Sequence, residues 1–160
     1  MSYSSSELYL ASQSPRRAEL LRQLDLSFET LPIDIDESPL GDELPVDYVR
    51  RMAIEKASAG CSLLRESPTA ESDLERSSDE GLRRLVLAAD TVVVHENHIL
   101  GKPADAEQAR AMMAQLSADR HWVMTAVALA CIPVSSVPTI DSVLSKTQVH
   151  FRAVSDAEAR

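Results

Sequence analysis

The chain has 160 residues, enough for one domain, and its 16 Lys and Arg residues against 25 Asp and Glu residues give a net charge of −9. Hydrophobic residues make up 44% of the sequence, which excludes disorder over the whole chain, while 4 Gly and 2 Cys exclude the collagen-like and disulfide-rich classes. The acidic balance argues against a nucleic-acid partner because it repels a polyanion, although a few local cations can still bind a small anionic ligand.

The sequence also argues against a membrane or secreted protein. No segment approaches the roughly 18 consecutive apolar residues of a membrane helix. Residues 1–7 lack the basic and apolar regions of a signal peptide. Cys61 and Cys131 are far apart and have no metal-ligand spacing, so we expect two free thiols. Together these features predict a cytoplasmic protein.

The first half of the chain alternates apolar and polar segments. Residues 34–47 contain six carboxylates and no Lys or Arg, which predicts a solvated loop. Residues 60–82 are rich in Ser, Glu, Asp, Thr and Arg, which predicts an exposed insertion loop within the domain. The predicted elements are a strand at 8–12, a helix with Ser14 as N-cap and Pro15 as first residue, a strand at 27–31, and a helix from about Pro45 to near Lys56.

The second half contains the clearest strand, over residues 85–94, whose nearly continuous apolar run is typical of a strand covered on both faces. The elements predicted after it are a short strand at 99–100, an amphipathic helix at 105–116, and strands at 122–132 and 143–151. Strands that alternate with helices predict an α/β or α+β sheet domain. We expect residues 1–160 to form one domain.

Asp90 is the residue that points most clearly to chemistry. It interrupts a run of Val, Leu and Ala, where a carboxylate is costly to bury without a partner. One interpretation is an aspartate that is satisfied by a partner or exposed at an edge. The other, which we favour, is a metal ligand or a general base at the end of a strand.

The stretch from Ser12 to Arg17 could bind an anion. A strand leads there into the start of a helix, where free backbone N–H groups favour anions. The hydroxyls of Ser12 and Ser14 and the guanidinium groups of Arg16 and Arg17 add donors, and arginine binds phosphate oxygens bidentately. The alternative is an ordinary capped helix with solvated arginines.

Lys56, Lys102 and Glu37 extend this set. A single lysine is usually a solvated surface group, but Lys102 lies in a constrained turn between Gly101 and Pro103, close in sequence to Asp90. Glu37 could hold Mg²⁺, which prefers a few carboxylates together with substrate phosphates. Phosphates held by Arg and Lys beside a carboxylate-bound metal indicate phosphoanhydride or phosphoester chemistry.

Several motifs in the same order resemble the Maf family of nucleoside triphosphate pyrophosphatases. They cover nearly the whole chain apart from residues 60–82. The matching segments are Leu10-Ala11-Ser12-Gln13-Ser14-Pro15-Arg16-Arg17, Tyr48-Val49-Arg50-Arg51-Met52-Ala53, Glu55-Lys56-Ala57, Ala88-Ala89-Asp90-Thr91-Val92-Val93, Leu100-Gly101-Lys102-Pro103 and His121-Trp122-Val123-Met124-Thr125-Ala126-Val127-Ala128-Leu129.

The resemblance implies hydrolysis of a nucleoside triphosphate between the α and β phosphates, which yields a monophosphate and pyrophosphate. It implies an α/β fold similar to the inosine triphosphate pyrophosphatases, with a mixed sheet flanked by helices and two lobes around a cleft. It also implies a divalent metal cation (Mg or Mn), a cytoplasmic location and, as in many members, a homodimer.

The resemblance also assigns roles to residues of this chain. It makes Asp90 the proton acceptor and a metal ligand together with Glu37. The physical argument agrees, because anhydride hydrolysis needs an oriented water and charge neutralisation on the departing pyrophosphate. The residues implied to contact the phosphates or to set base specificity are Ser14, Arg16, Arg17, Lys56, Thr91 and Lys102.

Thr91 and the run from Met124 to Val127 look like the branch of the family that acts on dTTP and UTP. The alternatives are the branch that acts on 7-methyl-GTP and a non-catalytic, nucleotide-binding or septum-regulating relative. The family pattern continues beyond Phe151 with a helix and an Ala-Gly-Ala-Tyr-Gly-Ile-Gln-Gly type segment that contributes to the substrate site, whereas this sequence ends at Arg160.

Overall fold

The computed structural model describes residues 6–66, 83–133, 137–155 and 157–158. Within these residues, no helix has the length and apolar character that a membrane crossing demands. The mixture of helices and strands confirms the predicted α/β class. In chain order the elements are β1 (Ser6–Leu10), α1 (Pro15–Gln23), β2 (Glu29–Thr30), α2 (Pro45–Glu66), β3 (Arg83–His95), β4 (His98–Leu100), α4 (Ala106–Leu116), β5 (Arg120–Ile132) and β6 (Thr139–His150).

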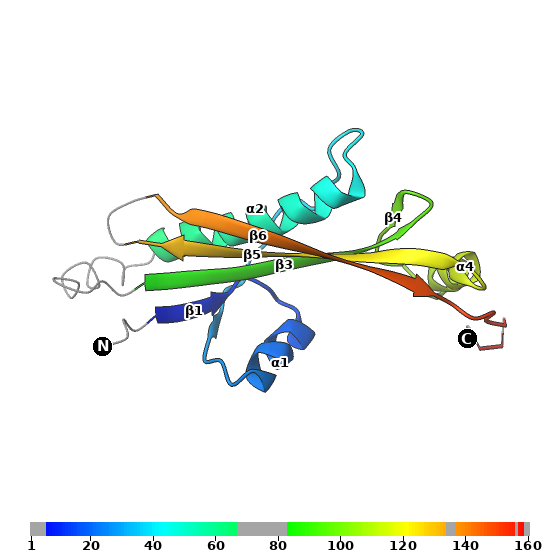
Figure 1. The fold of residues 1–160 in the computed structure, drawn as a ribbon, viewed down its shortest axis with the longest axis horizontal. Coiled ribbons are helices and arrows are strands. Elements are labelled where there is room, and N and C mark those ends of the chain that lie inside the picture. Colours follow the sequence, from blue (N-terminus) through cyan, green and yellow to red (C-terminus); the bar gives the residue numbers. More distant parts are fainter. Residues whose placement is uncertain (1–5, 67–82, 134–136, 156, 159–160) are drawn as a thin grey trace.

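The strands form one mixed sheet in the order β2-β1-β3-β5-β6, with β4 paired to β3 as well. β1 runs parallel to β2 and β3, whereas β4 and β5 run antiparallel to β3 and β6 runs antiparallel to β5. Figure 1 shows a long twisted sheet with α2 along one side, α1 below β1 and α4 at the far end. The sheet is flanked by helices, as predicted.

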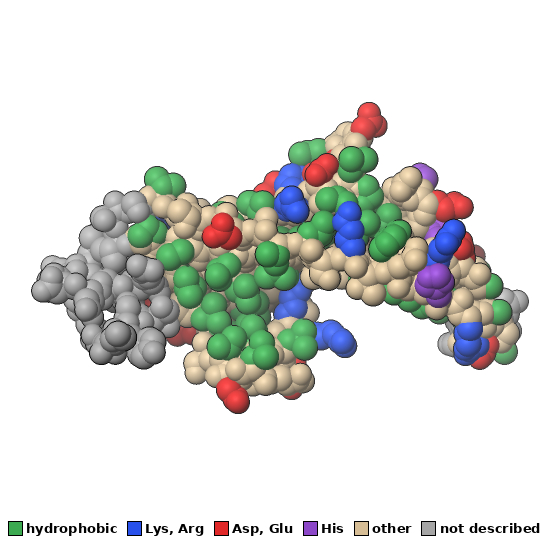
Figure 2. All heavy atoms as spheres, viewed as in Figure 1, with side chains coloured by type: hydrophobic (Ala, Val, Ile, Leu, Met, Phe, Trp, Pro, Cys, Tyr) green, Lys and Arg blue, Asp and Glu red, His purple; other side chains and the backbone are tan. Residues whose placement is uncertain are grey.

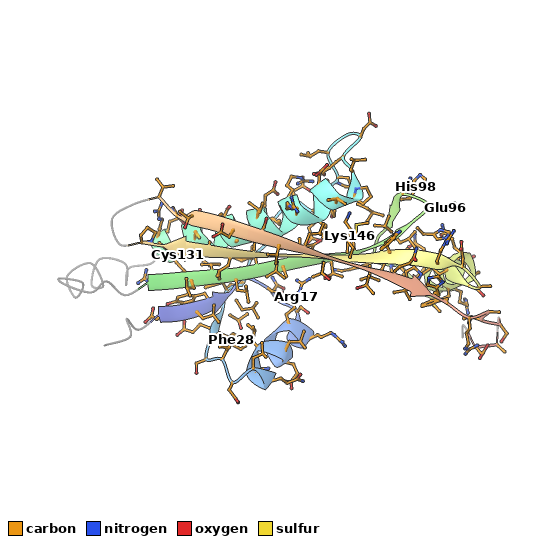
Figure 3. All side chains as sticks on the ribbon, in the orientation of Figure 1. Arg17, Phe28, Glu96, His98, Cys131 and Lys146 are labelled. Atoms are coloured by element: carbon orange, nitrogen blue, oxygen red, sulfur yellow. The ribbon has the colours of Figure 1, made fainter. Side chains whose placement is uncertain are left out.

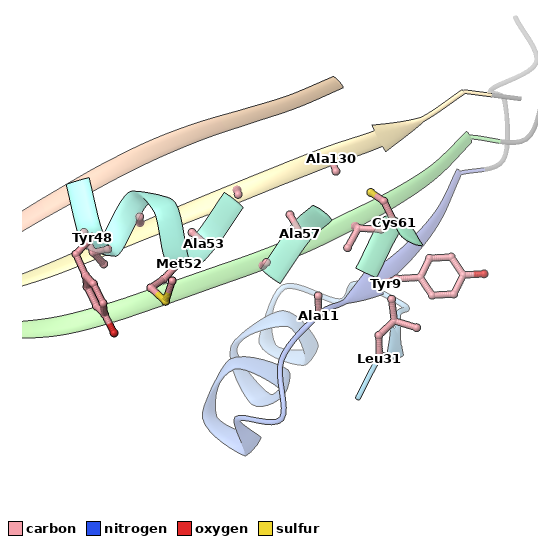
Figure 4. Packing of buried hydrophobic residues seen from close by; sticks show 14 of the residues in the cluster. Tyr9, Ala11, Leu31, Tyr48, Met52, Ala53, Ala57, Cys61 and Ala130 are labelled. Carbon is pink, nitrogen blue, oxygen red and sulfur yellow. The ribbon is translucent and has the colours of Figure 1, made fainter. Parts of the chain in front are cut away.

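Helix α2 covers one face of the sheet, and small side chains let it lie close to the strands (Figure 4). Ala53 and Ala57 of the helix and Ala88 and Ala126 of the sheet are fully buried. At Gly60 a Cβ atom would lie 2.7 Å from Val86 Cγ1, which is closer than real Cβ atoms approach a neighbour. The absence of a side chain at this position therefore permits the observed spacing between helix and sheet.

The prediction that α2 ends near Lys56 was wrong, because the helix continues to Glu66. Residues 60–66 are consequently helical rather than part of an exposed loop. Gly60, Cys61 and Leu64 are buried and continue the apolar stripe of the helix, although the residues between them are polar. The rest of the predicted insertion, residues 67–82, lies outside the described residues.

The prediction that β3 is covered on both faces was also only half right. Val86, Ala88, Val92 and Val94 face α2 and are buried, whereas Thr91 on the opposite face is exposed. On that opposite face, α1 packs only near β1 and the first part of β3, in a small apolar cluster of Leu10, Ala18, Leu21, Phe28 and Leu87.

The same uncovered face leaves apolar side chains exposed on the outer strands. Leu129 of β5 is 40% exposed and Val143 of β6 is 68% exposed. Figure 2 shows hydrophobic side chains gathered over the sheet and α1. One helix therefore provides most of the core, and it does so on the face that carries Asp90.

Candidate functional site

Three of the predicted residues meet at the centre of the molecule. The ammonium group of Lys56 on α2 donates to Asp90 Oδ1 at 2.8 Å, and its Nζ lies 2.6 Å from Glu37 Oε1. The side chains of Lys56 and Asp90 are each 14% exposed, whereas Glu37 is 50% exposed. Lys56 thus joins a carboxylate of the central strand to one in the loop that precedes α2.

The positive charge of Lys56 lies between the negative charges of Asp90 and Glu37, and this arrangement shifts the pKa of Lys56 and of Glu37. Burial disfavours the charge on Lys56, but the hydrogen bonds to Asp90 and Glu37 outweigh burial and raise its pKa. The hydrogen bond from Lys56 lowers the pKa of the Glu37 carboxyl, and the positive charges of Lys102 and Arg17 act on it in the same direction. Three of the predicted cations, Lys56, Lys102 and Arg17, therefore act on the Glu37 carboxyl.

Asp90 and Thr91 lie on opposite faces of the sheet, since successive side chains of a strand alternate. Asp90 points to the α2 face, where Lys56 meets it. Thr91 points to the other face, where its hydroxyl lies 3.0 Å from that of Thr125, the residue directly opposite on β5. A molecule that contacts both side chains must therefore reach around an edge of the sheet.

Such an edge exists beside these two residues. The pairing of β1 with β3 ends at Leu10 and Leu87, and the pairing of β4 with β3 ends at Leu100 and Val93. Among the described residues, no strand pairs with residues 88–92 on that side of β3, and we name this stretch the edge gap. The loop that enters α1 and the turn that carries Lys102 follow the two strand ends that border it.

The loop that enters α1 is held by Ser12, one of the two serines in the predicted anion-binding stretch. Ser12 is 8% exposed, and its Oγ accepts hydrogen bonds from the Ser14 backbone N–H at 3.2 Å and from Arg17 Nη1 at 3.3 Å. Ser12 thus orients Arg17, which lies between α1 and the sheet (Figure 3).

Ser14 occupies the predicted N-cap position of α1, but its side chain makes no capping hydrogen bond. The backbone N–H of Ser14 donates to Ser12 Oγ. The hydroxyl of Ser14 is therefore not committed to the helix start.

Arg16 and Lys102 are exposed, and no direct contact within the described ranges joins either of them to the Lys56 group. Lys102 nevertheless acts on Glu37 through its charge. Lys and Arg side chains lie in the middle of the molecule both above and below the sheet (Figure 2).

Two side chains near the site, Tyr48 and Arg51, were missed because their partners are distant in sequence. The Tyr48 hydroxyl donates to the Glu37 backbone carbonyl at 2.7 Å. The Arg51 guanidinium binds Glu43 through two hydrogen bonds of 2.7 Å. Arg51 also pairs with Glu55 at i, i+4 on the helix, a local spacing, whereas nothing in the sequence singles out Glu43.

The donor set around Lys56 fits a hard divalent cation. Glu37 and Asp90 already share one positive charge, and Mg²⁺ is commonly held by one or two carboxylates plus phosphate and water oxygens. In the described part of the chain, no group of three or more His, Cys, Asp or Glu residues is arranged to hold a metal by itself. The remaining ligands would have to come from substrate and water.

Comparisons with known proteins match this chain over most of its length. The family model described as Maf-like protein matches residues 7–160. A dTTP/UTP pyrophosphatase from Xanthomonas axonopodis pv. citri (strain 306) is 42% identical over 94% of this chain and 70% of its own length. Proteins of the same name from Pseudoalteromonas atlantica (strain T6c / ATCC BAA-1087) and Shewanella oneidensis (strain MR-1) are 44% and 43% identical, over 90% and 94% of this chain.

The chain spans about two thirds of the length of these curated relatives, 66% of the Pseudoalteromonas protein and 71% of the Shewanella protein. Among solved structures, the Staphylococcus aureus Ham1 protein aligns with 88% of this chain and 70% of its own, with 13% sequence identity and a TM-score of 0.45.

Proposed function

The chain belongs to the Maf family, and on that premise we propose that it hydrolyses dTTP and UTP to the nucleoside monophosphate and pyrophosphate. Its relatives at 42–44% identity carry the name dTTP/UTP pyrophosphatase. The observation that supports the chemistry best is the contact of Lys56 with both Asp90 and Glu37 beside the edge gap. In this proposal Asp90 is the acceptor for a proton, and Lys56 is the neighbouring cation that contacts phosphate.

In the proposed reaction, Asp90 accepts a proton from water while the water oxygen bonds to the α-phosphorus. The bond from that phosphorus to the bridging oxygen breaks, and pyrophosphate departs with the electron pair. Lys56 donates to Oδ1 of Asp90, and within the described chain Oδ2 has no partner, so it is the oxygen that accepts the proton.

Arg17, Lys56 and Lys102 bind the phosphates in this proposal, with Ser12 orienting Arg17. Arginine binds phosphate oxygens with two parallel hydrogen bonds, and lysine contributes a point charge. Ser14 offers a hydroxyl at the same helix start. Arg16 and Thr91 lie toward the other face, where they would contact the base of a nucleotide that reaches around the edge gap.

Glu37 and Asp90 are the residues that would hold Mg²⁺ or Mn²⁺. A divalent ion bound there supplies charge neutralisation for the phosphate oxygens and the leaving pyrophosphate. The cytoplasmic location and the homodimer implied by the family resemblance stay predictions. The expectation that residues 1–160 form one domain also stays a prediction.

The proposal is tested by pyrophosphate release from dTTP, UTP and 7-methyl-GTP with Mg²⁺ or Mn²⁺. We expect release from dTTP and UTP that falls by at least about a hundredfold in Asp90→Asn. Asp141→Asn is the matched control, because Asp141 is exposed on β6 opposite Leu129, and it should retain full activity.

Three other outcomes would contradict parts of the proposal. Preferred hydrolysis of 7-methyl-GTP would change the substrate. Nucleotide binding by folded protein with no release would indicate a non-catalytic member. Full activity of Asp90→Asn would remove Asp90 from the mechanism.

A further inference from the structure

The loop that carries Glu37 is fastened to the first turns of α2 by one arginine. Arg51 Nε donates to Glu43 Oε1 at 2.7 Å, and Arg51 Nη2 donates to Glu43 Oε2 at 2.7 Å. Nη2 also donates to the Ser38 backbone carbonyl at 3.0 Å. The Arg51 side chain is 19% exposed and Glu43 is 10% exposed, so this bidentate pair is shielded from solvent.

Neighbouring contacts complete the attachment. The Arg51 guanidinium lies 5.5 Å from the centre of the Tyr48 ring, and the Tyr48 hydroxyl donates to the Glu37 carbonyl. Within the loop, the Leu40 N–H donates to Glu43 Oε2 and the Glu43 N–H donates to the Leu40 carbonyl. The Glu43 carboxylate therefore accepts hydrogen bonds both from Leu40 within the loop and from Arg51 on α2.

Arg51 is unsuited to bind substrate directly. Its donors are occupied by the carboxylates of Glu43 and Glu55 and by the Ser38 carbonyl. Two carboxylates beside it also cancel its charge. Its contacts hold a chain segment in place instead, and that segment ends in the carboxylate that meets Lys56.

We propose that Arg51 is a positioning residue that keeps Glu37 within reach of Lys56. Residues 31–40 contain neither helix nor strand, so backbone hydrogen bonds of regular structure do not fix Glu37. Glu37 is half-exposed and would be free to move away from Lys56 if the loop detached. This inference rests on the proposed function, because it needs Glu37 to assist the reaction.

A double-mutant cycle tests the inference with the full chain. We expect Arg51→Gln to lower kcat/KM for dTTP at subsaturating Mg²⁺ by about tenfold, the lower end of what loss of a supporting partner costs. In a Glu37→Gln background, the same substitution should cost less than about twofold, because the residue that Arg51 positions is already gone. An equal loss in both backgrounds would overturn the proposal.

Hydrogen exchange of the loop amides supplies a readout that does not depend on activity. In Arg51→Gln, the Leu40 and Glu43 amides should exchange faster while buried amides of β3 stay protected. The charge-exchanged variant Glu43→Arg with Arg51→Glu should restore part of both the protection and the activity. Arg50→Gln, at the exposed neighbouring position, is the control that should change neither.

The outcomes separate this inference from the proposed function. Wild-type protein without pyrophosphate release overturns the proposed function. Wild-type release together with faster loop exchange but unchanged kcat/KM in Arg51→Gln overturns the positioning role alone.

Discussion

Lys56 and Asp90 are 34 positions apart in the chain, yet Nζ of the lysine lies 2.8 Å from Oδ1 of the aspartate and both side chains are 14% exposed. Screening by salt is weak for a pair so shielded from water. Removal of Lys56 leaves the Asp90 carboxylate without its partner in a partly buried position, which costs more than the net gain from the intact pair.

Lys56→Gln should therefore lose both activity and stability. At pH 7 we expect the free energy of unfolding to fall by about 1–3 kcal/mol, because Asp90 and Glu37 lose their shared donor.

The loss should depend on pH, because the pKa of Glu37 is lowered in the folded protein. The contribution of Glu37 to the free energy of unfolding is present above its ordinary pKa and is lost as the pH falls through the folded value. Urea unfolding at pH 7 and pH 3 should show that the difference from wild type shrinks in acid. Lys146→Gln, on the exposed β6 strand (Figure 3), is the matched control and should be near neutral.

Gly60→Ala should destabilise the protein despite the better helix propensity of alanine. The new Cβ would meet Val86 Cγ1 at 2.7 Å and Ala11 Cβ at 3.3 Å. Overpacking costs about 1–3 kcal/mol, which exceeds the roughly 0.8–1.0 kcal/mol that replacing Gly contributes to a helix. Thermal unfolding would show a lower Tm, whereas a raised Tm would mean that the helix can shift without loss. Ser58→Ala, at an exposed position of the same helix, is the control.

Tyr9→Phe should make the protein less sensitive to alkali. Burial and the hydrogen bond from the Tyr9 hydroxyl to Glu7 raise the pKa of Tyr9 from 10.0 to about 12. Between these values the unfolded chain binds fewer protons than the folded one, so the contribution of Tyr9 is intact below pH 10 and is lost as the pH rises toward 12. Unfolding free energies measured from pH 9 to 12 should decline less steeply in the variant. An identical slope would contradict the raised pKa.

His121→Leu should reduce the loss of stability in mild acid. His121 is 4% exposed, and within the described residues its Nδ1 has no hydrogen-bond partner. Burial and the nearby His95 lower its pKa, and Asp119 opposes this only partly. The unfolded chain therefore takes up a proton first as the pH falls below 6.5, which favours unfolding. Denaturant titrations at pH 7 and 5 should show a smaller difference in the variant, whereas the exposed His98→Leu should behave like wild type.

Local sequence patterns predicted most of the helices and strands. They failed in α2 beyond Lys56, where polar residues obscure the apolar helical spacing. The buried stripe of α2 beyond Lys56 consists of Gly60, Cys61 and Leu64 among Ser, Arg and Glu, so average composition suggested a loop where helical spacing persisted. The strands β3 and β5 were placed correctly because long apolar runs have few alternatives.

The candidate site, like the fold, was predictable from the sequence only in part. Asp90 was identifiable as a costly carboxylate in an apolar strand. Lys56 and Glu37 were weaker candidates from their residue types, and the family resemblance then assigned them roles. The pairing of Arg51 with Glu43 depends on how the loop folds back on α2, which no local spacing encodes. The edge gap depends on where two separate strands stop pairing with β3, and that register is a tertiary property.

The alanines beneath α2 have a consequence for the chemistry above them. Ala126 is the direct cross-strand neighbour of Asp90, and Ala57 adjoins Lys56 in the helix; both are fully buried. The height of the helix over the sheet is set by the thickness of this layer of methyl groups, and the 2.8 Å separation of Lys56 and Asp90 depends on that height. Larger side chains in the layer would raise the helix from the sheet and move the Lys56 backbone away from Asp90, so residues with no charge help to set the geometry of the charged pair.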